Sequence, residues 1–298
     1  MVTTAKSATY LGNVGYNRGS RLVEAVNAAL AASSPDSEVI VVDDHSDVPA
    51  VSVLAHLHDE RLRVVLNIDR KGAAGARNFG AKSARGEILF FSDDDDLIQR
   101  PYVSTVYDAV KCNAELSYGY GATKIMNSCG SVLIKTAYRE SRVIKSTCHV
   151  SPYIFGAGEG FWIRKDLFDK LGGFDPDLRI DEDTDLCVRL LLNGGAPYYS
   201  CCVASIIDRT EAPKLTNTSG LDLRIKCYLH TFKNNYVSPN ITLACRFFLA
   251  TRVLRIAARQ SRLGRYVLHE VLRFEKKGAV RLVYRIYYFA KLIRNALR

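Results

Sequence analysis

The chain has 298 residues, of which 48% are hydrophobic and 24% are charged. These proportions are typical of a folded protein and exclude a disordered or collagen-like chain. The eight cysteines form no CxxC pair, so we expect free thiols rather than a zinc ribbon or a disulfide scaffold. No uncharged apolar stretch reaches the length of a spanning helix, and the first residues lack the apolar core of a signal peptide. We therefore expect a cytoplasmic protein, at most peripheral to a membrane.

The net charge of +10 is concentrated at the end of the chain. From Leu243 to Arg298 there are 14 Lys and Arg residues against two acids, a net charge of +12. The first 242 residues carry the other 27 basic and 29 acidic residues and are close to neutral. This asymmetry predicts an anionic partner for the final segment alone.

Strand and helix patterns alternate over the first 112 residues. The predicted strands are Thr9–Val14, Glu38–Val42, Arg61–Leu66 and Glu87–Phe91, and the predicted helices are Ser20–Ala32, Gly75–Ala84 and Arg100–Cys112. Apolar strands that alternate with helices indicate a parallel sheet covered on both faces. We expect the second and fourth of these strands to be parallel neighbours.

The pattern changes from about Glu115 onward. Short strands and polar loops lead to a predicted helix over Glu182–Asn193 and a predicted strand over Cys201–Ile207. A turn-rich stretch over Asp208–Gly220 follows, and the remainder is helical in pattern. The chain therefore divides into an α/β part and a helical part.

Two acidic clusters follow predicted strands directly. They are Asp43-Asp44 and the run Asp93–Asp96. In open α/β sheets, ligands bind outside the carboxyl ends of the strands. Adjacent carboxylates repel one another unless water or a cation neutralises them. The alternatives are a solvated acidic loop and a site in which Mg²⁺ or Mn²⁺ joins the carboxylates to a phosphate.

The segment Lys71–Asn78 precedes a predicted helix and contains Gly72 and Gly75. A helix start with an unhindered backbone attracts anions, although a plain tight turn explains the glycines equally well. The spacing matches neither a GxGxxG nor a Walker motif.

A second acidic segment, Asp181–Asp185, opens the predicted helix over Glu182–Asn193. Acids are stabilised at a helix start, and Asp181 is a candidate cap. Asp185 and Arg189 are four residues apart and are expected to form a surface ion pair. The functional alternative is that one of these carboxylates is a general base.

These motifs resemble, in order, those of the family 2 glycosyltransferases, which are inverting, nucleotide-sugar-dependent enzymes with the GT-A fold. The matching segments are Tyr16-Asn17-Arg18, VVDDHS (Val41–Ser46), GAAGARNFGAKSARGEILFFSDDDD (Gly72–Asp96) and the segment Gly160–Gly194. One departure is His45, which stands where glycine is common. The resemblance implies a Rossmann-like GT-A domain over residues 1–212 and leaves residues 213–298 as a basic helical region outside the match.

On the donor side, the resemblance implies a nucleotide-sugar site with a bound metal. The expected nucleotide-sugar contacts are Tyr16, Asp43, Asp44, Arg77, Asp93 and Asp94. Asp93 and Asp95 match the outer members of a metal-binding DxD motif, with Asp95 as the expected direct ligand of Mn²⁺ or Mg²⁺.

On the acceptor side, the resemblance implies that Asp183 is the catalytic base. Glu182 and Arg189 belong to the same motif and are expected to orient it. The expected acceptor wall contains Gly158, Glu159 and Trp162. Trp162, the only tryptophan, is expected either to stack on a sugar or to lie in the core.

The function implied is inverting transfer of a sugar from a nucleoside diphosphate sugar, most simply a UDP-sugar, to a hydroxyl of a glycan or lipid-linked acceptor. Such a reaction serves polysaccharide or glycolipid synthesis at the cell surface. The alternatives are a sugar nucleotidyltransferase, a scaffold without activity and a non-enzymatic basic binding protein. No nucleic-acid-binding module is recognisable, so nucleic acid is not an expected partner.

The last helix pattern is amphipathic. Leu282, Ile286, Phe289, Ile293 and Leu297 fall on one face, while the other half of the wheel carries Arg281, Arg285, Lys291, Arg294 and Arg298 together with Tyr284, Tyr287 and Tyr288. One interpretation is a terminal helix that packs on the body with a solvated basic face. The other is an interfacial helix on anionic lipid, which places the protein at the inner face of the membrane.

Overall fold

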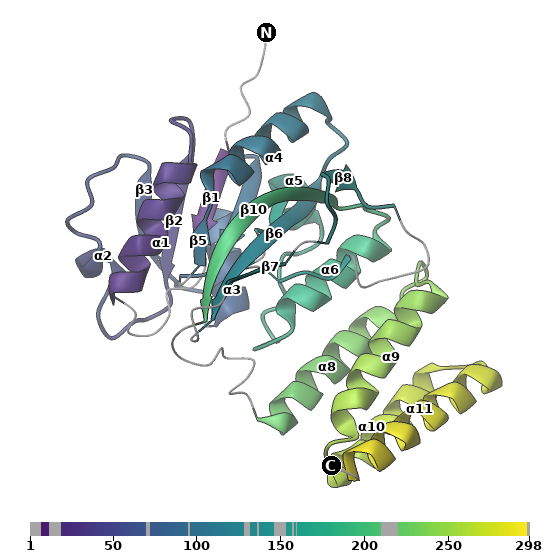
Figure 1. The fold of residues 1–298 in the computed structure, drawn as a ribbon. Coiled ribbons are helices and arrows are strands. Elements are labelled where there is room, and N and C mark those ends of the chain that lie inside the picture. Colours follow the sequence, from purple (N-terminus) through teal and green to yellow (C-terminus); the bar gives the residue numbers. More distant parts are fainter. Residues whose placement is uncertain are drawn as a thin grey trace.

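The structure is a computed structural model. It describes residues 7–11, 19–69, 72–94, 96–127, 132–135, 137–145, 153–156, 158, 160–209 and 220–296. Among these residues, ten strands form one mixed sheet in the order β3-β2-β1-β4-β9-β6-β10-β5, with β7 paired to β6 and β8 to β10 (Figure 1). The four strands at one side are β1 (Ser7–Leu11), β2 (Glu38–Asp43), β3 (Leu62–Leu66) and β4 (Ile88–Ser92), all parallel.

The expectation that the second and fourth predicted strands are neighbours is wrong. Strand β1 lies between β2 and β4 and pairs with both. The chain runs outward from β1 through β2 to β3 and then returns across β1 to β4. The order of strands therefore reverses beside β1, and such a switch point is where α/β sheets bind ligands.

The second half of the sheet is mixed in direction. Its strands are β5 (Asp96–Ile98), β6 (Tyr118–Asn127), β7 (Val132–Lys135), β8 (Arg142–Val143), β9 (Trp162–Arg164) and β10 (Tyr198–Arg209). Strand β9 runs antiparallel between β4 and β6, and β10 runs parallel to β6. The acidic run thus ends in a strand, because Asp96 is the first residue of β5, which pairs with β10.

Helices cover both faces of the sheet, as the sequence predicts. Helices α1 (Gly19–Ala32), α2 (Ala50–Val53) and α4 (Arg100–Cys112) pack on one face, and α3 (Ala73–Ser83), α5 (Lys165–Lys170) and α6 (Glu182–Leu192) pack on the other (Figure 1). The side chains of β4 alternate between the two cores: Ile88 and Phe90 join one, Leu89 and Phe91 the other. This alternation explains why the strand is apolar throughout.

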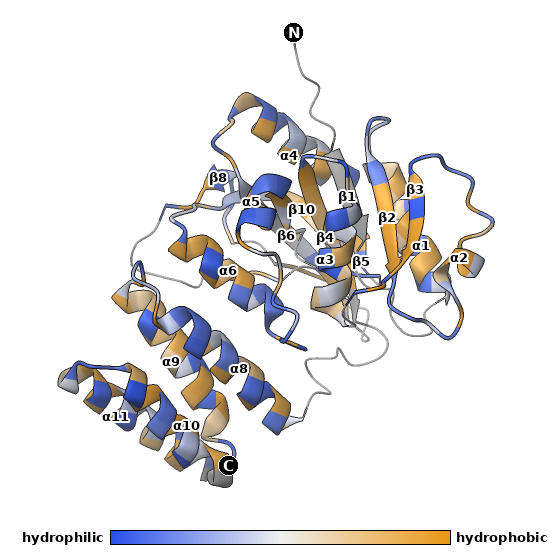
Figure 2. Ribbon diagram, turned by 180° about the vertical axis from the view of Figure 1, so that it is seen from behind, coloured by the Kyte–Doolittle hydropathy of each residue, from blue (hydrophilic) through white to orange (hydrophobic). Residues whose placement is uncertain are grey.

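The C-terminal region is a helical bundle with a core of its own. Its helices are α8 (Leu221–Tyr236), α9 (Leu243–Ala257), α10 (Ser261–Phe274) and α11 (Gly278–Ala296). The bundle lies beside α6 (Figures 1 and 2), and Val188 of α6 belongs to the same buried cluster as the helices of the bundle. The expected domain boundary at residues 212 and 213 falls outside the described residues.

Helix α11 packs through its tyrosines. Tyr284 and Tyr288 are buried in the bundle, whereas Leu282, Ile286, Phe289 and Ile293 are between 50% and 61% exposed. The helix thus packs on the bundle with Arg281, Arg285 and Arg294 exposed, as the first interpretation expects, but the buried residues are tyrosines from the basic half of the wheel and not the apolar stripe. The hydroxyl of Tyr284 lies 3.3 Å from that of Tyr236, so the ring fills the core while its polar end has a partner. Leu297 and Arg298 lie outside the described residues.

Candidate active site

The carboxylate of Asp43 organises the loop that follows β2. Its Oδ1 accepts a hydrogen bond from the backbone N–H of Ser46 and its Oδ2 accepts one from that of Ala50, each at 2.8 Å. His45, within this loop, has a φ of +68°, a left-handed conformation that glycine adopts without strain. This conformation is the physical reason why glycine suits the position at which the sequence departs from the family pattern.

Asp44 connects three segments at the carboxyl end of the sheet. Its Oδ1 accepts a hydrogen bond from the Asn67 side chain after β3, and its Oδ2 accepts one from the backbone N–H of Gly72 at the start of α3, each at 2.7 Å. Asp44 is only partly buried, whereas Asp43 is buried. Both aspartates are expected nucleoside contacts, and Asp44 has the more accessible carboxylate of the two.

Arg77 joins the donor-side and acceptor-side motifs. From the buried face of α3, its Nη2 donates to Oδ1 of Asp93 and its Nη1 donates to Oε1 of Glu182, each at 2.7 Å. The guanidinium carbon lies 5.4 Å from the centre of the Phe174 ring. The end of β4 and the start of α6 are thus held together by one buried cation.

The charges of this cluster depend on one another. Burial alone would lower the pKa of Arg77, but Asp93 and Glu182 outweigh burial and hold that pKa above its ordinary value. Burial raises the pKa of Glu182 to about 7, which Arg77 opposes and the neighbouring Asp183 reinforces. Loss of Arg77 would leave two carboxylates near each other without their cation, a costly arrangement for buried groups.

The acidic run after β4 is enclosed on one side by the backbone of Gly158. A Cβ atom at Gly158 would stand 2.3 Å from Oδ2 of Asp96 and 3.3 Å from Oδ2 of Asp93. Asp94 is also largely buried. Gly158 therefore lies beside the expected metal loop, and its carbonyl is held by the hydroxyl of Ser205 at 2.6 Å.

The expected metal ligands are Asp93 and Asp95, and the structure describes only Asp93. Asp95 is not described, and among the residues that are, no three His, Cys, Asp or Glu side chains come together as a metal site. Oδ1 of Asp93 accepts the hydrogen bond of Arg77, and its Oδ2 lies outside that ion pair. The acidic run offers a small number of carboxylate oxygens. Such a site suits a hard divalent cation that takes its remaining ligands from the phosphates of a substrate.

Asp183 stands in the first turn of α6 and is only partly buried. Its Oδ1 accepts the backbone N–H of Thr184 at 2.7 Å. Glu182, the preceding residue, is the one bound to Arg77. The candidate base is therefore placed next to the Arg77 cluster at the edge of the sheet.

Two expectations about the neighbours of Asp183 are wrong. Asp181 is not a side-chain cap, because its buried carboxylate accepts hydrogen bonds from Thr231 and Arg252 instead. The pair of Asp185 and Arg189, joined at 2.8 Å, does not lie on the surface, since Asp185 is 2% exposed. Burial of α6 under the C-terminal bundle is the cause in both cases.

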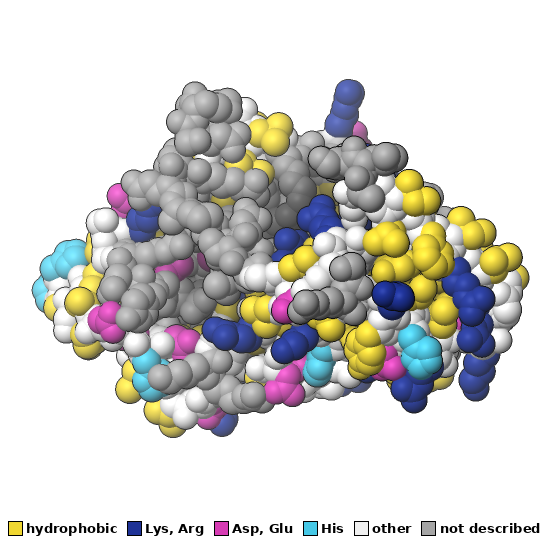
Figure 3. Space-filling view, turned by 90° about the horizontal axis from the view of Figure 1, so that it is seen from below, with side chains coloured by type: hydrophobic (Ala, Val, Ile, Leu, Met, Phe, Trp, Pro, Cys, Tyr) yellow, Lys and Arg dark blue, Asp and Glu magenta, His cyan; other side chains and the backbone are white. Residues whose placement is uncertain are grey.

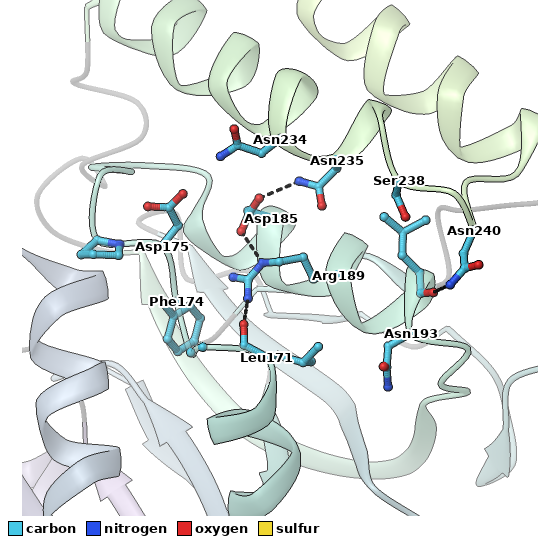
Figure 4. A pocket seen from close by; sticks show the side chains of 14 residues that line it. Leu171, Phe174, Asp175, Asp185, Arg189, Asn193, Asn234, Asn235, Ser238 and Asn240 are labelled. Atoms are coloured by element: carbon cyan, nitrogen blue, oxygen red, sulfur yellow. Dashed lines mark hydrogen bonds and ion pairs between the residues drawn. The ribbon is translucent and has the colours of Figure 1, made fainter.

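Arg189 ties α6 to the loop after α5. Its Nη1 donates to the carbonyl of Leu171 at 2.8 Å, in addition to its bond with Asp185. These residues line a cavity of about 560 Å³ between α6, that loop and the end of α8, where Asn234 and Asn235 are found (Figure 4). Any influence of Arg189 on Asp183 is therefore exerted through the helix.

The only tryptophan belongs to the core. Trp162 is fully buried in β9 and packs in the same cluster as Phe90 and Tyr102. Its Nε1 would lie 2.7 Å from a Cβ at Gly119, so the ring fills the space above this glycine. Of the two expectations for Trp162, a core residue is therefore confirmed, and neither face of its ring is exposed to a sugar. Tyr16 and Glu159, two further expected site residues, lie outside the described residues.

The site also contains residues that were not predicted, among them Thr231, Asn235 and Arg252. All three come from the C-terminal bundle and bind the side chains of Asp181 or Asp185. No motif marks them, because they lie in the segment that the family resemblance does not cover.

The parallel strands β1–β4, the acidic loops at their carboxyl ends and the acidic start of α6 beside them form the arrangement expected of a GT-A glycosyltransferase. The model of glycosyl transferase family 2 matches residues 14–172, more than half of the chain. The chain belongs to this family.

Relatives of known sequence agree with this assignment. An uncharacterised glycosyltransferase of Haemophilus influenzae is 28% identical over 176 residues, which are 59% of this chain and 59% of that protein. The chain therefore spans less than two thirds of that relative. The glucosyltransferase WfaP of Escherichia coli, named for a UDP-Glc donor and a GlcNAc-diphosphoundecaprenol acceptor, is 35% identical over 81 residues, 27% of this chain and 32% of that protein.

The fold has counterparts among solved structures. The crystal structure of S. aureus TarS 1–349 in complex with UDP-GlcNAc superposes with a TM-score of 0.70 and 16% sequence identity, covering 97% of this chain and 89% of that one. The likeness thus extends over both the α/β part and the helical bundle, and at this identity it concerns the fold.

Proposed function

We propose that this protein is an inverting glycosyltransferase that moves a sugar from a UDP-sugar to a hydroxyl group of a glycan or lipid-linked acceptor. The observation that carries the proposal is the buried Arg77, which bonds both to Asp93 of the donor-side acidic run and to Glu182 beside the candidate base. This pairing supports the proposal because it joins the expected donor-side loop to the helix that carries the expected base. Family membership favours this activity over the nucleotidyltransferase and binding-protein alternatives.

In the proposed reaction, the carboxylate of Asp183 accepts the proton of the acceptor hydroxyl. The acceptor oxygen then bonds to the anomeric carbon on the face opposite the diphosphate. The bond between that carbon and the diphosphate oxygen breaks, and the nucleoside diphosphate leaves with the electron pair. This single displacement inverts the anomeric centre and requires no covalent intermediate with the protein.

Asp93 and Asp95 would hold the divalent cation, Mn²⁺ or Mg²⁺, which neutralises charge on the leaving diphosphate. Arg77 holds Asp93 in place through the hydrogen bond from its Nη2 to Oδ1 of Asp93, at 2.7 Å. We assign Arg77 an indirect role toward the nucleotide, because its guanidinium is buried and two of its nitrogens are engaged by carboxylates. Asp44, with the more accessible carboxylate, is the stronger candidate for contact with the nucleoside.

A lipid-linked acceptor is supported by two observations. WfaP and a Campylobacter jejuni glucosyltransferase, 33% identical over 109 residues, are both named for undecaprenol-linked acceptors. In this chain, helix α11 exposes an apolar stripe made of Leu282, Ile286, Phe289 and Ile293. None of the described helices is both long enough and apolar enough to cross a bilayer.

The stripe fits the surface of an anionic membrane. It lies opposite the buried Tyr284 and Tyr288 on the helical wheel, and Arg285 and Arg294 lie on either side of it. Figure 3 shows hydrophobic and basic side chains interspersed on this part of the molecule. The two acids after Leu243 both have partners within the bundle: Glu270 pairs with Lys233 at 2.5 Å, and Glu275 accepts the Tyr236 hydroxyl at 2.5 Å.

We therefore propose that α11 lies in the interface of the inner leaflet, with its apolar stripe among the acyl chains and its arginines at the anionic headgroups. The basic flanks disfavour the pairing of two copies through this stripe, since such pairing brings like charges together.

The transfer activity is tested by incubating the protein with UDP-sugars, a hydroxyl acceptor and Mn²⁺, and by determining the anomeric configuration of the product. The proposal expects metal-dependent transfer with inversion. Transfer with retention, or release of a nucleoside monophosphate rather than a diphosphate, would contradict it.

A further inference from the structure

Asp181, two residues before the candidate base, has an unusual conformation for its position. Its φ is +75°, a left-handed conformation that is unfavourable for a residue with a side chain. The side chain is fully buried, and it makes no cap to the helix that it precedes. The reaction as proposed gives Asp181 no chemical role, so its conformation requires another explanation.

The C-terminal bundle supplies the partners of this carboxylate. Thr231 of α8 donates its hydroxyl to Oδ2 of Asp181 at 3.0 Å, and Nη2 of Arg252, on α9, donates to Oδ1. The same Nη2 reaches the hydroxyl of Thr184 at 3.0 Å. Arg252 is itself held in place, because its guanidinium carbon lies 4.4 Å from the centre of the Tyr228 ring.

Arg252 thus contacts side chains on both sides of Asp183, at positions 181 and 184. A second residue of the bundle, Asn235 of α8, donates a hydrogen bond from its Nδ2 to Oδ1 of Asp185 at 2.7 Å and so holds the next residue of the same turn. Arg77 of α3 binds Glu182 in the same turn. The turn that carries Asp183 is therefore held both by the catalytic domain and by the C-terminal bundle.

We propose that Arg252, assisted by Thr231, is a positioning residue that sets the location of the Asp183 carboxylate through the left-handed residue Asp181. This inference rests on the proposed function, in which Asp183 is the base. It makes the bundle part of the active site in addition to its role at the membrane. A displacement of a catalytic group by about 1 Å costs up to about 100-fold in rate, so a loosened turn should be visible in kcat.

The test compares Arg252→Met and Arg252→Lys with the wild type, using a soluble acceptor so that membrane binding does not enter. We expect Arg252→Met to lower kcat by about 10- to 100-fold and to leave the affinity for UDP and the KM for the donor unchanged, because Arg252 does not touch the donor side. Arg252→Lys keeps the charge but loses part of the geometry, and we expect it to recover part of the rate.

Arg255→Met is the matched control, since Arg255 lies one turn further along α9 and is exposed. It should keep the wild-type kcat. If Arg252→Met does not fold, Thr231→Val decides the question, because it removes a single hydrogen bond to Asp181 and nearly preserves the shape of the side chain. We expect about a fivefold lower kcat for Thr231→Val, the equivalent of one hydrogen bond.

Folded Arg252→Met or Thr231→Val protein with the wild-type kcat would overturn the inference and reduce these contacts to structural ones. A parallel measurement of Asp183→Asn separates this outcome from a failure of the proposed function. If Asp183→Asn is inactive while Arg252→Met is fully active, only the positioning role is rejected. If Asp183→Asn keeps the wild-type rate, the assignment of the base itself is wrong.

Discussion

Arg77 and Glu182 are separated by 105 residues in the sequence and joined by a hydrogen bond of 2.7 Å between Nη1 and Oε1. The same guanidinium holds Asp93 at the end of β4. One side chain of α3 thereby fixes the distance between the loop expected to bind the metal and the helix that carries Asp183. Donor and acceptor chemistry have to meet within a few ångströms, and under the proposed function this cluster holds the two expected sites together.

Replacing this arginine should affect stability and activity together. We expect Arg77→Met to destabilise the protein by about 3 kcal/mol, because the change leaves buried carboxylates without their cation. Chemical denaturation measures this loss, and transfer activity should fall below detection. Arg63→Met is the control: Arg63 binds Glu38 at the same 2.7 Å but is more exposed, so its loss should cost less than about 1 kcal/mol. Equal effects of the two substitutions would contradict the role given to Arg77.

The stability of the protein should depend on pH through Glu182. Burial raises the pKa of Glu182 to about 7, whereas an exposed glutamate has a pKa of about 4.3. The folded state therefore holds the proton more tightly than the unfolded chain, so this group's contribution to stability is complete below about pH 4 and is lost as the pH rises through about 7.

The free energies of unfolding of the wild type and Glu182→Gln, measured between pH 5 and pH 8, test this dependence. We expect the decrease with pH to be smaller in Glu182→Gln by about 1–3 kcal/mol. Part of the decrease should remain, because burial also raises the pKa of Asp181, to about 6. Glu24→Gln, at an exposed position on α1, should behave as the wild type. Parallel curves for wild type and Glu182→Gln would contradict the prediction.

Much of the sheet could be predicted from the sequence, and its order could not. The continuous apolar runs of β2 and β4 mark buried strands, and the structure contains both. The position of β1 between them depends on contacts between segments far apart in the sequence, which no local sequence pattern predicts. Strand β6 lies in the region after Glu115, for which the sequence indicates short strands but not their bounds. In the structure, a Cβ at Gly119 would stand 2.0 Å from the carbonyl oxygen of Tyr198, so the glycine permits close packing of two strands.

The candidate site was predictable in its acidic residues but not in their partners. Acids at strand ends and helix starts are visible in the sequence, whereas their pairing with Arg77, Thr231 or Arg252 requires the tertiary structure. The amphipathic pattern of α11 was also visible. Which face packs inward was not, because tyrosine is amphipathic and packs in the core when its hydroxyl has a partner.

Asp95 is the residue through which the metal expectation is tested most simply. We expect Asp95→Ala to abolish Mn²⁺-dependent binding of UDP and transfer activity. The protein should remain folded, with unchanged or slightly higher stability, because the substitution removes one charge from a repulsive cluster. Isothermal titration calorimetry with and without Mn²⁺ provides the measurement. Turnover at the wild-type rate in Asp95→Ala would show that the ligand has been misassigned.

The proposed membrane surface predicts binding to anionic vesicles. We expect the protein to co-sediment with liposomes containing phosphatidylglycerol at low salt and to be released at high salt. The double substitution of Ile286 and Phe289 by serine should abolish binding, because it removes about half of the apolar stripe.

The control for this experiment replaces Val51 and Ile68 by serine, since both side chains are exposed and belong to the other end of the molecule. This variant should bind as the wild type does. Failure of the folded wild-type protein to bind at any salt concentration would contradict the membrane assignment. A dimer in solution that the Ile286 and Phe289 substitutions dissociate would show that the stripe binds a second copy instead.

The most direct measurement for the whole account is the transfer rate of Asp183→Asn alongside its affinity for UDP. If Asp183 is the base, asparagine cannot accept the proton of the acceptor, and kcat should fall by about 10²–10⁴-fold. The affinity for UDP in the presence of Mn²⁺ should stay within about twofold of the wild type, since this change removes no expected donor contact. Loss of UDP binding in a folded Asp183→Asn protein, or an unchanged kcat, would contradict the central claim.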